Sequence, residues 1–113
     1  MLVEDADTAR SLGTGTVPVL ATPRLIALCE EATVAALAGH LPSDQTHVGG
    51  RVQFDHLAPV RPGSEVIAEV VLQRVEGRRL IFTVSASDAA GLVGAGRLTR
   101  VVVDSEQFLA RAR

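Results

Sequence analysis

The stretch Thr22–Leu37, TPRLIALCEEATVAAL, decides the fold, because large apolar side chains recur along it with helical spacing. Thr22 suits the N-cap, Pro23 the first helical position, and Gly39 the C-terminal end. On a helical wheel only a narrow stripe is predicted to face solvent: Arg24, Ala27, Glu31 and Ala38. A helix with so wide an apolar surface is predicted to be buried on several sides.

After this helix the apolar pattern changes to alternation, which is typical of strands. The expected strands are Thr46–Leu57, Glu65–Val75, Arg79–Asp88 and Leu92–Val103. Strict alternation in the first strand places Val48, Val52, Phe54 and His56 on one face, and His47, Arg51, Gln53 and Asp55 on the other. A short edge strand is expected at Met1–Val3, and Asp104 is expected to cap a short terminal helix.

A buried helix followed by antiparallel strands with short turns predicts an α+β fold in which a curved sheet wraps the helix. We expect one domain over residues 1–113 and about five strands. Unpaired sheet edges and leftover apolar surface favour a homodimer, and a higher assembly is left open.

The composition narrows the function classes. The formal net charge is -2 and no run of basic residues occurs, which argues against a nucleic-acid partner. No apolar stretch approaches the roughly 18 residues of a membrane span, and the acidic N-terminal segment does not read as a signal peptide. Cys29 is the only cysteine, so we expect a cytoplasmic protein with no disulfide.

Glu30 is the most informative residue of the helix. It falls between Val34 and Leu37 on the wheel, whereas Glu31 falls on the polar stripe. Burying an unpaired carboxylate costs several kcal/mol, so such a residue is expected to serve an ion pair, a polar network or catalysis. A partly desolvated carboxylate is also a stronger base.

His56 is the second candidate, because a histidine can carry protons near neutral pH. His40 and His47 are expected to be exposed, and Cys29 to be a buried small hydrophobe. A metal site formed by the three histidines is not expected, because His47 and His56 are assigned to opposite faces of one strand.

The chain resembles the fluoroacetyl-CoA thioesterase group of hot-dog thioesterases over nearly its whole length. The resemblance is carried by the helix TPRLIALCEEATVAAL, the strand and turn THVGGRVQFDHLAPVRPGSEV and the hairpin VEGRRLIFTVSASD. It implies a hot-dog homodimer with two sites at the subunit interface. It also implies an acyl-CoA substrate, with no metal and no separate cofactor.

The resemblance assigns the catalytic threonine, glutamate and histidine to Thr22, Glu30 and His56, and places Gly49 near the acyl group. Glu30 would activate water or attack the acyl carbon, while His56 would orient Glu30 or protonate the leaving thiolate. Thr22 and Glu30 are separated by two helical turns, about 12 Å of rise. They can therefore share a site in three ways only. Either Thr22 lies outside the regular helix, or the substrate lies along the N-terminal part of the helix, or Thr22 reaches the site from the other subunit of a dimer.

The substrate is expected to be a small acyl-CoA whose phosphates meet Arg78 and Arg79. The fluoroacetyl-specific enzyme has a phenylalanine-bearing lid before the helix, whereas Ser11–Val17 contains no aromatic residue. We therefore expect a different short or medium acyl group.

Two other functions fit parts of the sequence. The turn Pro59–Gly63 resembles one found in (R)-specific enoyl-CoA hydratases, which use an aspartate and a histidine where this helix offers Glu30. The second alternative is a hot-dog dimer that binds acyl-CoA without catalysis.

Overall fold

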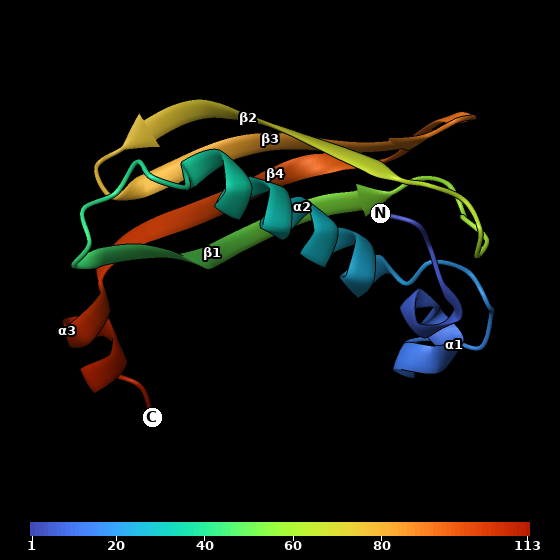
Figure 1. Ribbon diagram of the computed structural model, residues 1–113, viewed down its shortest axis with the longest axis horizontal. Helices are drawn as coiled ribbons and strands as arrows, with labels where there is room; N and C mark the ends of the chain where they lie inside the picture. Colours follow the sequence, from blue (N-terminus) through green and yellow to red (C-terminus); the bar gives the residue numbers. More distant parts are fainter.

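The computed structural model describes residues 1–113 and is built from one long helix and four long strands (Figure 1). In chain order the elements are η1 (Asp5–Asp7), α1 (Ala9–Leu12), α2 (Thr22–Leu37), β1 (Gln45–His56), β2 (Ile67–Glu76), β3 (Arg79–Asp88), β4 (Gly91–Asp104) and α3 (Ser105–Ala110). The strand boundaries lie within two residues of those expected from alternation and turn residues. The expected terminal helix is confirmed, because the Asp104 side chain accepts a hydrogen bond from the Gln107 amide.

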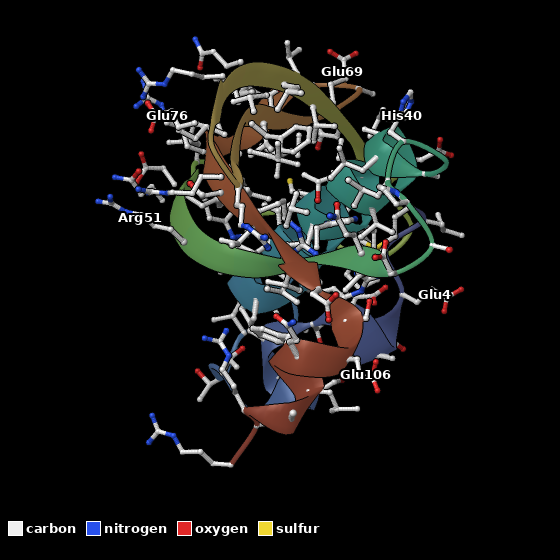
Figure 2. The ribbon with its side chains drawn as sticks, turned by 90° about the vertical axis from the view of Figure 1, so that its left-hand side faces the viewer. Glu4, His40, Arg51, Glu69, Glu76 and Glu106 are labelled. Carbon is white, nitrogen blue, oxygen red and sulfur yellow. The ribbon has the colours of Figure 1, made fainter.

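The four strands form one antiparallel sheet in the order β1-β4-β3-β2, so β1 and β2 are its edges. The sheet curves around α2, which lies on its concave face (Figure 1, Figure 2). The expected fifth strand is reduced to an isolated bridge between Leu2 and Glu65, next to β2. A backbone hydrogen bond from Val3 to Ser64 accompanies this bridge.

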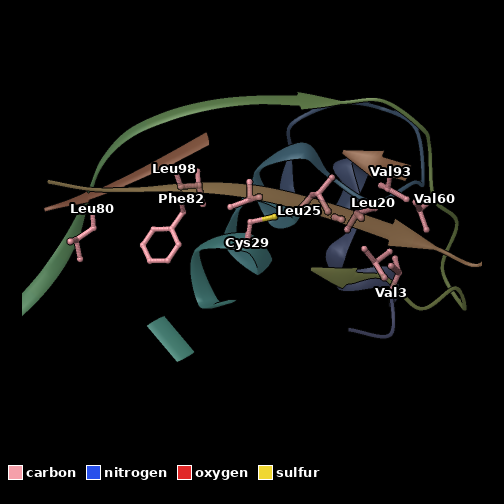
Figure 3. Close-up of a cluster of buried hydrophobic side chains, with 12 residues drawn as sticks. Val3, Leu20, Leu25, Cys29, Val60, Leu80, Phe82, Val93 and Leu98 are labelled. Carbon is pink, nitrogen blue, oxygen red and sulfur yellow. The ribbon is translucent and has the colours of Figure 1, made fainter. Parts of the chain in front are cut away.

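The core lies between α2 and the concave face of the sheet (Figure 3). The helix contributes Leu25, Cys29 and Thr33, which are fully buried. Phe82, Leu98 and Val93 face them from the sheet. Full burial of a side chain such as Leu25 stabilises the fold by roughly 2 kcal/mol. Burial also raises the pKa of the Cys29 thiol to about 11, and the expectation that Cys29 is a buried small hydrophobe is confirmed.

The N-terminus of α2 differs from the prediction. The N-cap is Ala21, and Thr22 is the first helical residue, so its hydroxyl does not cap the helix. At the other end, Gly39 follows the C-cap Ala38 with a φ of 77°, the left-handed conformation that glycine adopts freely. Thr22 is therefore free to make a contact outside the helix.

The two faces of β1 also differ from strict alternation. The pairing of β1 with β4 shifts between Gly49 and Arg51, which marks a β-bulge at Gly50. One extra residue reverses the alternation on one side of the bulge. His47 therefore faces α2 together with Phe54 and His56, and the expectation that His47 and His56 lie on opposite faces was wrong.

The two short helices α1 and α3 extend beyond the β1 edge of the sheet, at its opposite ends (Figure 1). α3 exposes Phe108 and Leu109 to solvent. None of the helices combines the length and the apolar content that crossing a bilayer demands.

Candidate active site

Thr22, Ile26, Glu30 and Val34 form one row along α2, because they follow at intervals of four residues. This row borders the buried face of the helix on the side of β1. Ile26 and Glu30 are half-buried, whereas Thr22 and Val34 are exposed. The predicted difference between the two glutamates is confirmed, since Glu31 lies on the outer side and pairs there with Arg24.

Thr22 and His56 meet at the N-terminal end of α2. Thr22 Oγ1 lies 2.8 Å from Nδ1 of His56, the last residue of β1. The other ring nitrogen, Nε2, is buried and has no hydrogen-bond partner within the chain. A buried polar atom without a partner is costly, and such atoms cluster where a ligand or a water completes the site.

A cavity of about 380 Å³ opens beside this pair. Its walls come from the loop before α2, the first turn of α2 and the segment that follows β1, and they include Thr16, Val17, Thr22, His56 and Leu57. Within the stretch that has no aromatic residue, only residues 14–17 border the cavity, and their side chains are short.

Glu30 is paired with Arg100, a residue of β4 that the sequence did not single out. Oε2 of Glu30 accepts a hydrogen bond of 2.8 Å from Nη1 of Arg100. The Arg100 side chain is only 8% exposed, whereas that of Glu30 is 38% exposed. The carboxylate is therefore neither unpaired nor immersed in solvent. The arginine stabilises its charged form from the protein side, and its free side remains accessible.

His47 is the third member of this cluster. Its Nδ1 accepts a hydrogen bond of 3.1 Å from Nε of Arg100, and its backbone carbonyl accepts one of 3.4 Å from Nη2. Burial and the adjacent Arg100 charge lower the pKa of His47. The expectation of an exposed His47 was wrong, because the bulge at Gly50 turns it towards α2. His40, by contrast, is exposed beyond the end of α2 (Figure 2).

Gly49 lies against the Glu30–Arg100 pair. A Cβ on Gly49 would lie 3.0 Å from Oε2 of Glu30 and 3.2 Å from Nη1 of Arg100. Since few real Cβ contacts are that short, any larger residue would push the ion pair away from the strand. The absence of a side chain lets the β1 backbone approach the carboxylate closely.

Arg78 and Arg79 lie at the hairpin between β2 and β3, and both are exposed. Arg78 borders a second cavity of about 380 Å³ at the far end of β4, together with Phe108 and Arg111 of α3. Within one chain neither arginine forms a hydrogen bond or an ion pair with Glu30, Thr22 or His56.

Within one chain the site residues fall into two clusters. The first is Thr22 with His56, and the second is Glu30 with Arg100 and His47. Thr22 and Glu30 both belong to the regular helix, two turns or about 12 Å apart. The possibility that Thr22 leaves the helix is therefore excluded, and the two clusters do not touch each other.

A long helix on the concave face of a curved antiparallel sheet is the arrangement of a hot-dog protein, and here a glutamate and two histidines lie on the β1 side of that helix. Residues 3–106 match the model of the FlK family, described as fluoroacetyl-CoA-specific thioesterase. The chain belongs to this family, which confirms the resemblance drawn from the sequence. A similar curated protein is the fluoroacetyl-CoA thioesterase of Streptantibioticus cattleyicolor, 37% identical over 95 residues that cover 84% of this chain and 68% of the relative.

Solved structures agree with this assignment. A structure of the fluoroacetyl-CoA thioesterase FlK superposes with a TM-score of 0.92 at 33% identity, covering 98% of this chain and 87% of that one. A mutant of the same enzyme in complex with fluoroacetate and CoA gives 0.90 at 32% identity, covering 96% and 91%. A hot-dog-like protein from Thermanaerovibrio acidaminovorans gives 0.91 at 28% identity, covering 98% and 82%. The expected hot-dog fold is confirmed.

Proposed function

We propose that this protein hydrolyses the thioester of a small acyl-CoA, giving the free acid and CoA, with a site completed by homodimerisation. Membership of a thioesterase family supports the reaction. A similar enzyme has been solved with fluoroacetate and CoA, which supports the class of substrate. Thr22, Glu30 and His56 are the proposed catalytic residues.

The observation that carries this proposal is the Thr22–His56 pair beside the cavity. The 2.8 Å contact with Thr22 fixes the orientation of the imidazole. It leaves Nε2 as the nitrogen without a partner, buried at the site. A histidine fixed through one nitrogen, with the other free, is the arrangement that proton transfer requires.

The chemistry assigns one step to Glu30 and one to His56, while Thr22 orients His56. Water attacks the acyl carbon and gives a proton to the Glu30 carboxylate, whose Oε2 is held by Arg100. The C–S bond of the tetrahedral intermediate then breaks. His56 accepts at Nε2 the proton that Glu30 took up and delivers it to the leaving CoA thiolate, so both groups return to their starting states. A backbone N–H near Gly49 would stabilise the oxyanion, because this glycine lets the strand approach the Glu30 side of the site.

Dimerisation through β1 would bring the two clusters together. β1 is an edge strand with one unpaired side. If two copies pair antiparallel about a two-fold axis near Arg51, the beginning of one β1 lies beside the end of the other. The Glu30 cluster of one protomer would then face the Thr22–His56 pair of its partner.

The acyl group is proposed to be short or medium in length and different from fluoroacetyl. The segment that borders the cavity contributes Thr14, Gly15, Thr16 and Val17 and no aromatic ring. Arg78 and Arg79 are proposed to meet the CoA phosphates, since both are exposed cations near the end of the sheet where Glu30 lies. A cytoplasmic location is proposed on the single buried Cys29.

The test is thiol release over acyl-CoAs of graded length, combined with subunit mixing. Glu30→Gln and His56→Ala should each lower kcat by about 100-fold or more as pure dimers. Mixed together, they should recover about a quarter of the native activity, because half of the dimers are mixed and each has one intact site.

Four results would count against parts of the proposal. Native protein that releases no thiol across the panel, yet binds acyl-CoA, would favour a binding module. Hydration of crotonyl-CoA without thiol release would favour a hydratase. Full native activity of the Glu30→Gln dimer would remove Glu30 from the mechanism, and failure of the mixed dimers to recover activity would place each site within one chain.

A further inference from the structure

Arg100 is held in one orientation by three hydrogen bonds. Nη1 donates to Oε2 of Glu30, Nε donates to Nδ1 of His47, and Nη2 donates to the carbonyl of His47. Its side chain is 8% exposed, so water has little access to it. Two of the three bonds depend on His47, although the sequence offers no reason to connect residues that are 53 positions apart.

The Nε contact fixes the chemical state of the His47 ring. The guanidinium is always protonated, so Nε can only donate and Nδ1 of His47 must accept. A ring that accepts at Nδ1 is neutral and carries its proton on Nε2. The ordering contact therefore exists only while His47 is uncharged.

Glu30 is at the other end of the same chain of contacts. Its Oε2 takes a hydrogen bond from Arg100, and Gly49 leaves no side chain between the carboxylate and the strand. No other hydrogen bond of this protomer reaches the Glu30 carboxylate. The direction in which the carboxylate points therefore depends on where the guanidinium is held.

We propose that His47 is a positioning residue that orients the Glu30 carboxylate through Arg100. This inference rests on the proposed role of Glu30 in thioester hydrolysis. His47 does not touch the reacting atoms. Its Nδ1 and its backbone carbonyl accept hydrogen bonds from Arg100. These bonds keep the guanidinium in the orientation in which Nη1 donates to Glu30.

The arrangement also makes the site sensitive to acid. The charged groups that face His47 are Arg100 from β4 and, through Arg100, Glu30 from α2. Protonation of the ring turns Nδ1 into a donor opposite Nε–H and places two cations side by side. Because the pKa of His47 lies below 6.5, the ordered form persists at neutral pH and is lost as the pH falls through that lowered pKa.

The experiment compares His47→Asn with His47→Leu. The asparagine amide oxygen reaches the position of Nδ1, accepts from Nε and does not titrate, whereas leucine offers no acceptor. We expect His47→Leu to lower kcat by about 10- to 100-fold with little change in KM. His47→Asn should keep a kcat near the native value, and its kcat should lose the ionisation step that the native enzyme has below pH 6.5.

A second readout needs no activity. The unfolded chain takes up a proton on His47 near pH 6.5, and the folded chain does so only at lower pH. The unfolded state therefore binds more protons between these two values, and the native protein loses stability as the pH falls below 6.5. The thermal midpoint of His47→Asn should fall less than that of the native protein over this range.

These outcomes separate the two proposals. If the native enzyme is active and Glu30-dependent, but His47→Leu keeps its native kcat and pH profile, the positioning role is wrong and the hydrolase remains. A His47→Asn variant that is as slow as His47→Leu, with an unchanged thermal midpoint at pH 7, also overturns it. If native protein releases no thiol, the hydrolase proposal fails, and the thermal midpoints still report whether His47 titrates against Arg100.

Discussion

At the scale of single residues, the site is defined by side chains that hold one another in fixed orientations. Thr22 holds His56, and Arg100 holds Glu30. In each pair one member is proposed to act on the substrate, and the other limits its freedom. Such preorganisation lowers the entropy that must be lost when the transition state forms.

The hydroxyl of Thr22 can be tested directly. We expect Thr22→Val to lower kcat about 5-fold, because one neutral hydrogen bond contributes about 1 kcal/mol. Thr22→Ser is the matched control, since it keeps the hydroxyl within reach of Nδ1 of His56. Measurement of kcat for thiol release checks both variants. Equal rates for valine and serine would show that the hydroxyl does not orient the histidine.

The family resemblance supplied the three proposed catalytic residues, whereas Arg100 was not predicted and His47 was predicted on the wrong face of β1. Glu30 stood out because helical periodicity is a local signal, and the wheel separated it correctly from Glu31. Arg100 has no such signal: it lies in a strand 70 positions from Glu30, and only the paired sheet brings them together. Thr22 was taken for a cap, because a threonine before a proline at a helix start fits that role.

At the scale of secondary-structure elements, β1 and β4 are joined unusually closely. A Cβ on Gly96 would overlap the carbonyl oxygen of Gln53, and one on Gly94 would lie 2.6 Å from the Phe54 ring. These glycines let the two strands and the Phe54 ring pack without a gap. His56, which pairs with Gly94 in the register, is placed by this contact.

Gly96→Ala should therefore be strongly destabilising. We expect a loss of about 3 kcal/mol or more in the free energy of unfolding, because the clash is with backbone and only a shift of a strand can relieve it. Gly77→Ala is the control: a Cβ there meets nothing within 4 Å, and only its φ of 60° is unfavourable. It should cost about 1 kcal/mol. Chemical denaturation of both variants checks this, and equal losses would contradict it.

The strand limits were predictable because alternation and glycine-containing turns are both local. The bulge was not, because two consecutive glycines in a strand fit a regular ladder as well as an irregular one. Only the partner strand decides between them: β4 presents Arg100 opposite Gly49 and Thr99 opposite Arg51, which leaves Gly50 unpaired. The error in the face of His47 follows from that single residue.

At the scale of the whole molecule, the two edges of the sheet differ. The β2 edge is partly covered by the bridge from Leu2, whereas the outer side of β1 pairs with nothing in this chain. α1 and α3 stand beyond the two ends of β1 (Figure 1). Val52 on β1 is 47% exposed. These features support β1 as the edge through which two copies meet.

Val52→Glu tests this interface. In a two-fold dimer the two introduced carboxylates would lie near one another in a desolvated interface. Because their burial and repulsion destabilise the dimer, we expect the variant to be monomeric. It should also lose most thioesterase activity, since each site would be incomplete. Val71→Glu is the matched control, because Val71 is 63% exposed on the opposite edge strand. Light scattering after size exclusion gives the mass, and a dimeric Val52→Glu would refute the β1 interface.

The bulge at Gly50 shifts the alternation of side chains along β1 by one residue. Deleting Gly50 would remove the bulge. The residues of β1 that precede it would then exchange faces of the sheet. His47 would leave Arg100, and Val48 would take its place beside a buried guanidinium that it cannot satisfy. A single glycine, which has no side chain, therefore decides whether two histidines of β1 face the same helix.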